Sequence, residues 1–272
     1  MTVKLISDEK IAATSSKGNQ EKWYDKETGK WHKLDRLGYE SLAETVISEL
    51  LNESNVEKDT PFSFVRYGMT RLSVHGRERT GCVSNNFLKE GESIVTLNRL
   101  LTLYLGCPLK EKLLRLPSDR KRIEYLANTT AEITGLDRFP EYLTLIFEID
   151  SLFLNDDRHL NNIAVIEKDG GYSYCPIFDN GAGLLSDMRF LPPDVEPKGL
   201  IKEVVAMPFG TTFTRQMNGA RSLFGNVLNI RKFGREELAA KVGRYLDFYP
   251  KRDAAIITDR IVETVLVRQK MM

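Results

Sequence analysis

Residues 155–183 read NDDRHLNNIAVIEKDGGYSYCPIFDNGAG, and this stretch decides how the chain is interpreted. Two runs of strand-forming residues, 163–166 and 172–178, flank a polar turn that contains two glycines. Such a pattern predicts an antiparallel β-hairpin. Because a hairpin brings its two ends together, Asn162 at its entry and Asp179 at its exit should be neighbours in space.

The residue types at the two ends of this hairpin suit a metal-assisted reaction. A carboxylate and a carboxamide are hard oxygen donors, which suits Mg²⁺ held jointly by a protein and by nucleotide phosphates. Asp157 precedes Asn162 by five positions, the spacing found in the catalytic loop of protein kinases. An acceptor carboxylate can orient an attacking hydroxyl and receive its proton. The sequence therefore predicts Asp157 as the catalytic residue, and Asn162 and Asp179 as metal ligands.

The motif Asp157-Arg158-His159-x-x-Asn162, followed by a hairpin and Asp179, resembles the HipA-like Ser/Thr kinases and, more distantly, the phosphatidylinositol kinases. Either polar segment alone could be an ordinary turn, and their combination in this order carries the resemblance. The resemblance implies an ATP- and Mg²⁺-dependent phosphotransferase. We then expect His159 to pack and hydrogen-bond so that it holds the catalytic loop, rather than to act as a base, and Arg158 to pair with a loop carboxylate.

Residues 15–22 read SSKGNQEK and resemble the loop that covers the nucleotide phosphates in HipA-like kinases. Ser15 lies three residues before Gly18, as the serine of the family does. Gly18 permits a close approach of the backbone to a phosphate, and Lys22 could add positive charge. Ser15 is also a candidate for autophosphorylation, because an added dianion in this loop would repel the phosphates of a nucleotide.

Two aromatic segments between residues 20 and 34 flank a polar turn with a glycine and predict a further β-hairpin. Lys33, in its second strand, resembles the lysine with which the family contacts the nucleotide phosphates. The acidic partner of Lys33 would be Glu40 or Glu44, which lie one turn apart on the amphipathic helix predicted for residues 39–51. The sequence does not choose between the two glutamates.

The remaining periodicity predicts an α+β protein with a two-lobed, protein-kinase-like fold. Residues 1–88 are predicted to form a β-rich N-terminal lobe, with further strands at 62–67 and 81–84. Residues 89–272 are predicted to form a mainly helical C-terminal lobe that contains the catalytic loop and the metal-binding hairpin. Adenine is expected to stack against the connector near residues 83–88. Helices are predicted at 93–105, 118–135, 141–154, 235–249 and 252–268.

Composition and charge limit the classes of partner. The 272 residues are 28% charged and 42% hydrophobic with a formal net charge of +1, which is typical of a globular protein and gives no global attraction to nucleic acid. No stretch approaches the roughly 20 apolar residues of a membrane helix, and the start lacks the apolar region of a signal peptide. The three cysteines are far apart and are expected to be reduced. We expect a cytoplasmic protein whose partners are ATP and a protein substrate with a Ser or Thr acceptor.

Other functions stay open at this level. The motif Asp-Arg-His-x-x-Asn is also the form found in phosphatidylinositol kinases, so the acceptor could be a lipid or a small molecule. A nucleotide-binding pseudokinase is a different class, although Lys33, Asp157, Asn162 and Asp179 are all of the types that transfer requires. Transfer of a nucleotidyl group is a further alternative. Longer HipA-like proteins carry an extra domain before the phosphate loop, so we expect a compact member for which operon binding and a paired antitoxin do not carry over.

Overall fold

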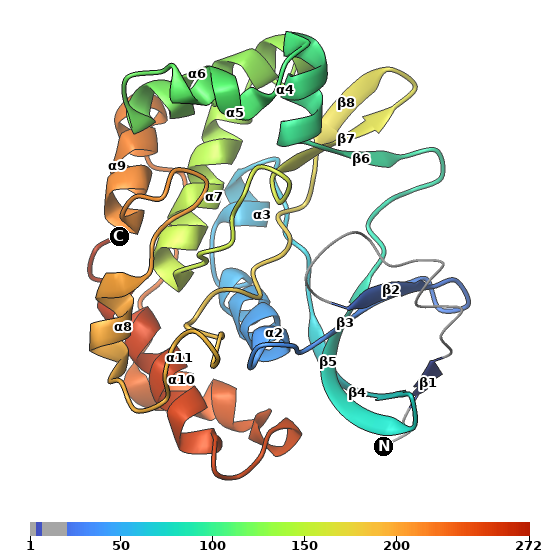
Figure 1. Ribbon diagram of the computed structural model, residues 1–272, viewed down its shortest axis with the longest axis vertical. Coiled ribbons are helices and arrows are strands. Elements are labelled where there is room, and N and C mark those ends of the chain that lie inside the picture. Colours follow the sequence, from blue (N-terminus) through green and yellow to red (C-terminus); the bar gives the residue numbers. More distant parts are fainter. Residues whose placement is uncertain (1–3, 7–20) are drawn as a thin grey trace.

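The computed structural model describes residues 4–6 and 21–272 (Figure 1), so the predicted phosphate loop with Ser15 and Gly18 lies outside the described residues. The N-terminal part contains the strands β1 (Lys4–Ile6), β2 (Lys22–Asp25), β3 (Lys30–Leu34), β4 (Gly68–Val74) and β5 (Arg77–Asn85). They form one sheet in the order β1-β4-β5-β3-β2. β1 runs parallel to β4, and all other neighbours in this sheet are antiparallel.

One long helix lies between this sheet and the helical part of the molecule (Figure 1). It is α2 (Glu40–Leu51), which confirms the predicted helix, and every residue in it except Glu49 is buried. The predicted hairpin before it is also confirmed, with Lys22 opposite Lys33 in the β2–β3 pair. Because α2 is buried on all sides, a charged side chain such as Glu44 requires a partner in the interior.

The C-terminal part is mainly helical and is built around one buried helix. Its elements are β6 (Ser93–Thr96), α4 (Leu97–Leu105), α5 (Leu109–Leu114), α6 (Asp119–Thr134), α7 (Phe139–Phe153), β7 (Ala164–Lys168), β8 (Gly171–Tyr174), α8 (Pro197–Glu203), α9 (Phe213–Phe224), α10 (Arg235–Gly243), the 3₁₀ turn η1 (Leu246–Phe248) and α11 (Ala254–Arg268). The central helix α7 packs against α6, α9 and α11 and shares an apolar core with α2. The short helix α3 (Val56–Asp59), which lies between α2 and β4 in the sequence, packs into the same core through Val56. α6, α7 and α11 confirm three predicted helices. Among the described residues, none of the helices combines the length and the apolar character needed to cross a bilayer.

The hairpin predicted from the central motif is confirmed. β7 and β8 pair antiparallel, and β6 adds a third strand on the other side of β7. The hairpin emerges from the helical part at the level of α4 (Figure 1). This arrangement places Asn162, which precedes β7, and Asp179, which follows β8, on the same side of the molecule.

The strand predicted for residues 62–67 is wrong. The segment makes one isolated bridge, between Phe64 and Ile177, and the strand β4 begins only at Gly68. Phe62 and Phe64 are apolar because they are buried in the core that α2 and α7 share. Burial in a core produces the same run of apolar residues as a buried strand does, and the sequence alone could not separate the two.

Two helix boundaries also differ from the prediction. The helix predicted for 93–105 begins later, because residues 93–96 are the strand β6 and Thr96 caps the helix that follows. A short strand with a β-branched sequence can pair with β7, which the periodicity of the chain did not reveal. The helix predicted for 235–249 ends at Gly243 and gives way to η1.

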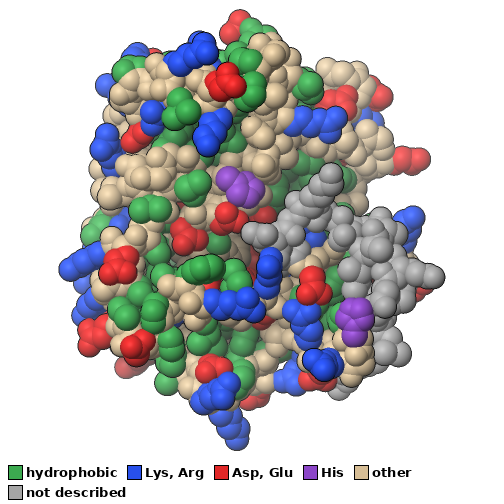
Figure 2. All heavy atoms as spheres, in the orientation of Figure 1, with side chains coloured by type: hydrophobic (Ala, Val, Ile, Leu, Met, Phe, Trp, Pro, Cys, Tyr) green, Lys and Arg blue, Asp and Glu red, His purple; other side chains and the backbone are tan. Residues whose placement is uncertain are grey.

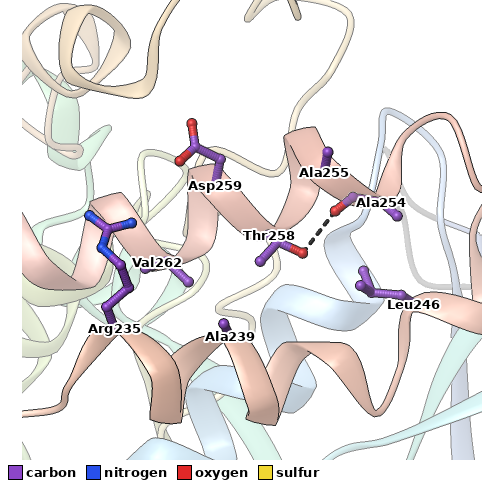
Figure 3. Close-up of a pocket in the computed structure, with 8 residues that line it drawn as sticks. All are labelled: Arg235, Ala239, Leu246, Ala254, Ala255, Thr258, Asp259 and Val262. Atoms are coloured by element: carbon purple, nitrogen blue, oxygen red, sulfur yellow. Dashed lines mark hydrogen bonds between the residues drawn. The ribbon is translucent and has the colours of Figure 1, made fainter.

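The last two helices pack against each other through small side chains (Figure 3). A groove of about 450 Å³ lies between α10 and α11, and Ala239, Ala254 and Thr258 are among the residues that border it. Leu246 of η1 borders the same groove. The 3₁₀ turn is thereby seated against the helical part from which it projects.

Candidate active site

A cleft of about 720 Å³ separates the loop after β3 and the start of α2 from the catalytic motif. The predicted residues Asp157, Asn162 and Asp179 all line it, together with Glu40 and His159. In Figure 2, acidic side chains gather beside a histidine near the middle of the face shown. The other lining residues are Lys22, Arg36, Leu37, Ile94, Thr96, Asp156, Asn161, Phe178, Gly181, Ala182, Ser186 and Asp187.

Lys33 joins three elements behind this cleft, where it contacts the cleft residue Asp179. Its Nζ lies 2.6 Å from Oε1 of Glu44 and 2.6 Å from Oδ1 of Asp179. Burial alone would lower the pKa of Lys33, but the two carboxylates raise it well above its ordinary value. Lys33 is therefore a fixed cation that links β3, α2 and the end of the hairpin. Glu44, and not Glu40, is the acidic partner that the sequence left undecided.

Glu40 has a different task. Its carboxylate accepts hydrogen bonds from the backbone N–H groups of Arg36, Leu37 and Gly38, with the bond from Leu37 measuring 2.6 Å. Side-chain acceptors at the beginning of a helix commonly satisfy N–H groups of the preceding turn in this way. Glu40 shapes the loop that forms one wall of the cleft, and the structure does not bring it to Lys33.

Asp179 is held ionised. Burial would raise its pKa, but Lys33, Lys22 and Arg158 together bring the pKa well below its ordinary value. Its backbone has a positive φ of 62°, a conformation in which aspartate is tolerated better than most residues. The next residue, Asn180, donates its backbone N–H to Oε2 of Glu44 at 2.9 Å. The segment after the hairpin is therefore docked onto α2.

The catalytic loop is a tight turn around Asp157. The carbonyl oxygen of Asp157 accepts hydrogen bonds from the backbone N–H of His159 at 2.8 Å and from Nδ2 of Asn162 at 3.1 Å. The side chain of Asp157 is 65% exposed and borders the cleft. Burial of its surroundings raises the pKa of Asp157, His159 opposes the shift, and the charge of Asp179 adds to it. Asp157 is therefore a reachable carboxylate with increased affinity for a proton.

Arg158 anchors this loop from beneath. It is fully buried, and its guanidinium pairs with Asp150 at 3.0 Å, a residue of α7. It also donates to the carbonyl oxygens of Phe178 at 2.6 Å and Asn162 at 3.1 Å, and to Oδ1 of Asn180. The expected carboxylate partner is thus on the central helix and not in the loop. Arg158 fixes both ends of the hairpin relative to α7.

His159 contacts the loop through its backbone, and its ring borders the cleft. Its side chain is 41% exposed and lines the cleft, with Nε2 3.9 Å from Oδ2 of Asp157. Its backbone does support the loop, because its carbonyl oxygen accepts the N–H of Asn162 at 2.8 Å. The predicted structural support by His159 is therefore visible in its backbone hydrogen bond, whereas its ring is partly exposed.

The side chains at the metal position fit a small divalent cation. The ionised carboxylate of Asp179 is a hard oxygen donor of the kind that Mg²⁺ prefers. Nδ2 of Asn162 is engaged with the loop backbone, which makes the amide oxygen the atom that a metal would use. One carboxylate and one amide leave further positions on such an ion for phosphate oxygens.

An apolar side of the cleft adjoins the connector between the two parts. Ile94 and Phe178 line the cleft, and the ring of Phe178 lies 6.3 Å from that of Phe87. Phe87 belongs to the connector near which adenine was expected. This side has the character that a planar base requires.

Three charged cleft residues were not singled out as site residues by the sequence. Asp156 has its pKa raised to about 7 by burial and by the charges of Asp157 and Asp187. Asp187 reaches the cleft because it forms an isolated β-bridge with Gly38, and no local sequence pattern reveals this contact. Arg36 borders the cleft from the loop after β3. Asp156 could have been found, since it adjoins Asp157, the predicted catalytic residue, in the sequence.

Comparison with known proteins agrees with this geometry at the level of the fold. No protein-family model and no curated protein matches the sequence. The N-terminal sheet, the buried helix α2 and the helical part with its hairpin form a two-lobed, kinase-like fold. More particularly, the fold is similar to those of two solved proteins, a bacterial kinase and a HipA protein.

One of these structures is a Helicobacter pylori proinflammatory kinase, CtkA, which is 12% identical with a TM-score of 0.58 over 95% of this chain and 89% of that chain. The other is the complex of HipA, HipB and operator DNA from a toxin–antitoxin system of Shewanella oneidensis MR-1, where the match is 13% identical with a TM-score of 0.50. That match covers 93% of this chain and 64% of the other. The predicted α+β, protein-kinase-like fold and the resemblance in fold to HipA-like kinases are confirmed.

Proposed function

We propose that this protein is an ATP- and Mg²⁺-dependent kinase that phosphorylates Ser or Thr hydroxyls of a protein. The observation that carries the proposal is the shared cleft of Asp157, Asn162 and Asp179, with Lys33 bound to both Asp179 and Glu44 behind it. The similarity in fold to a protein described as a kinase supports phosphoryl transfer as the reaction. The choice of a Ser or Thr acceptor rests on the resemblance to HipA-like kinases.

Each residue has a role that follows from its surroundings. Asp157 is exposed and binds protons more readily than an ordinary aspartate, so it can orient an acceptor hydroxyl and take its proton. Lys33 keeps a positive charge behind Asp179 that would attract the phosphates of ATP, and Lys22 on the neighbouring strand would add a second charge at the cleft itself. Asp179 and Asn162 would hold Mg²⁺, which when bound neutralises charge on the phosphoryl oxygens.

The adenine of ATP would lie on the apolar side formed by Ile94 and Phe178, and its phosphates would point toward Lys33. In this pose the loop with Ser15 and Gly18, which lies outside the described residues, would cover the phosphates. We propose Ser15 as a site of autophosphorylation. Intact mass after incubation with Mg-ATP should increase by one phosphate in the wild type and not in Ser15→Ala; an unchanged wild-type mass would contradict this part of the proposal.

The experiment that tests the function compares ATP labelled on the γ-phosphate with ATP labelled on the α-phosphate, with and without Mg²⁺. Acceptors are a generic basic protein, phosphoinositide vesicles and the enzyme itself, and phosphoamino-acid analysis identifies the labelled residue. We expect γ-label on Ser or Thr and none on lipid. Label on lipid would make the protein a lipid kinase, α-label would indicate nucleotidyl transfer, and ATP binding without any label would indicate a pseudokinase.

A further inference from the structure

Residues 244–249, which we name the strap, connect the helical part to strands β4 and β5 of the N-terminal sheet. The strap follows α10 and includes η1, at the lower end of the view in Figure 1. Leu246 seats it against the α10–α11 pair (Figure 3). On the sheet side, the hydroxyl of Thr80 donates to the carbonyl oxygen of Phe248 at 2.7 Å, and the guanidinium of Arg71 lies 5.3 Å from the Phe248 ring. The strap therefore contacts both parts of the molecule.

The strap also contacts α2 near its C-terminal end and the segment that precedes its N-terminal end. Near the C-terminal end of α2, Glu49 accepts hydrogen bonds from the hydroxyl of Tyr245 and from the guanidinium of Arg244. Before its N-terminal end, the hydroxyl of Tyr249 donates to Oδ2 of Asp35 at 2.8 Å. These side chains reach α2 from an element that lies about 200 positions later in the sequence.

The carboxylate of Asp35 connects Tyr249 to the first turn of α2 through two hydrogen bonds. Its other oxygen, Oδ1, accepts the backbone N–H of Ser41 at 2.6 Å. The N-cap residue of α2, Tyr39, makes no side-chain capping bond, so Asp35 supplies the acceptor that the first turn needs. Glu44 follows Ser41 by three residues on the same helix and carries the ion pair with Lys33.

We propose that Tyr249 is a positioning residue for phosphoryl transfer, which acts through Asp35 and the first turn of α2 on the Lys33–Glu44 pair. The proposal rests on the kinase function proposed above. In kinases the strand lysine and the helix glutamate must both be in place for activity, and their placement is a common point of control. In this chain the strap of the helical part would set that placement.

The ionisation of Asp35 gives the connection a measurable signature. The pKa of Asp35 is raised to about 7. Burial and the charge of Glu40 raise it, and the hydrogen bonds with Ser41 and Tyr249 lower it. Arg79 faces the same residue and donates to its backbone oxygen at 3.0 Å, and Cys82 lies within electrostatic range. The ionised carboxylate accepts from both Ser41 and Tyr249, so the connection is complete above pH 7. Loss of the Tyr249 hydroxyl should raise the pKa of Asp35 further.

The test compares Tyr249→Phe with Tyr104→Phe, a matched loss of one hydroxyl on the exposed side of α4. Rates of γ-phosphate transfer are measured from pH 6 to 8.5, with melting curves to verify that each variant is folded. We expect Tyr249→Phe to lower kcat at pH 7 by about fivefold, the equivalent of one ordinary hydrogen bond, and to move the rise of activity to higher pH. In an Asp35→Asn background, Tyr249→Phe should cause no further shift of the pH profile.

The outcomes separate this proposal from the function on which it rests. No transfer by the wild type would overturn the proposed function, and the positioning role with it. Transfer by the wild type, with the same kcat and the same pH profile in Tyr249→Phe and Tyr104→Phe, would overturn the positioning role alone. A lower rate with an unshifted profile, or a shift that persists in Asp35→Asn, would show that the strap does not act through Asp35.

Discussion

Asp150→Asn removes the negative charge that faces the buried guanidinium of Arg158 while it keeps the shape of the side chain. Both oxygens of Asp150 accept from Nε of Arg158 at 3.1 Å, and Asn155 donates to one of them at 3.0 Å. Arg158 and Asp150 are 0% and 1% exposed. The variant therefore leaves a cation in the interior without its counter-ion.

The expected loss of stability is at the lower end of the range for such a change. Removal of one partner from a buried ion pair costs about 3–5 kcal/mol, because the other charge stays buried. Arg158 keeps its hydrogen bonds to Phe178, Asn162 and Asn180, and burial already raises the pKa of Asp150, so part of the cost of burying that carboxylate is relieved. We expect a loss of about 3 kcal/mol, or about 6 °C in Tm for a chain of this size.

Urea unfolding at constant pH and ionic strength measures this loss. The matched control is Glu141→Gln, which breaks the pair of Arg138 and Glu141, whose side chains are 46% and 37% exposed. An exposed pair of this kind is worth about 0.5 kcal/mol. If the unfolding free energies of Asp150→Asn and Glu141→Gln were equal within error, the anchoring role assigned to Arg158 would be refuted.

Two further predictions concern packing and pH. At Gly38 an added Cβ would lie 2.0 Å from the carbonyl oxygen of Ser186, so Gly38→Ala should lower the free energy of unfolding by about 3 kcal/mol. The control is Gly68→Ala, which should change the free energy of unfolding little, because an added Cβ at Gly68 meets open space. Equal melting temperatures of the two variants would contradict this prediction. The pKa of Asp179 is held below its ordinary value, so its contribution to stability is present above the unfolded-state pKa of about 4 and is lost as the pH falls below that. Lys33→Met should make the unfolding free energy less dependent on pH between 5 and 2.5, and an unchanged dependence would count against the ion pair.

The sequence predicted the elements whose signal is local. A polar turn between two runs of strand formers identified both hairpins, and helical spacing identified α2, α6, α7 and α11. It failed where an apolar run had two possible causes. Residues 62–67 are apolar because they cross the shared core, and residues 93–96 are a strand because β7 lies beside them. Neither cause is visible in a window of local sequence.

The sequence also predicted the part of the candidate site whose signal is local. The hairpin argument brought Asn162 and Asp179 to one side of the molecule, and the loop spacing added Asp157. The choice of Glu44 over Glu40 could not be made, because both lie on one helical face and only the packing of α2 decides which one reaches Lys33.

The sequence could not predict contacts between residues that lie far apart in the chain. The carboxylate for Arg158 comes from the end of α7, and Asp187 reaches the cleft through a contact with the loop after β3. Tyr249 meets Asp35 across more than two hundred residues. No spacing rule relates such residues, because their proximity is a property of the assembled fold.

Phosphoryl transfer by Asp157 and Asp179 is tested most directly by the initial rate of γ-phosphate transfer from Mg-ATP. Four proteins are compared: the wild type, Asp157→Asn, Asp179→Asn and Asp169→Asn, the last in the turn between β7 and β8, where a positive φ of 52° also suits asparagine. We expect the wild type and Asp169→Asn to transfer phosphate at equal rates, and the other two to be slower by about 10²–10⁴-fold. Wild-type rates in Asp157→Asn or Asp179→Asn would contradict the account.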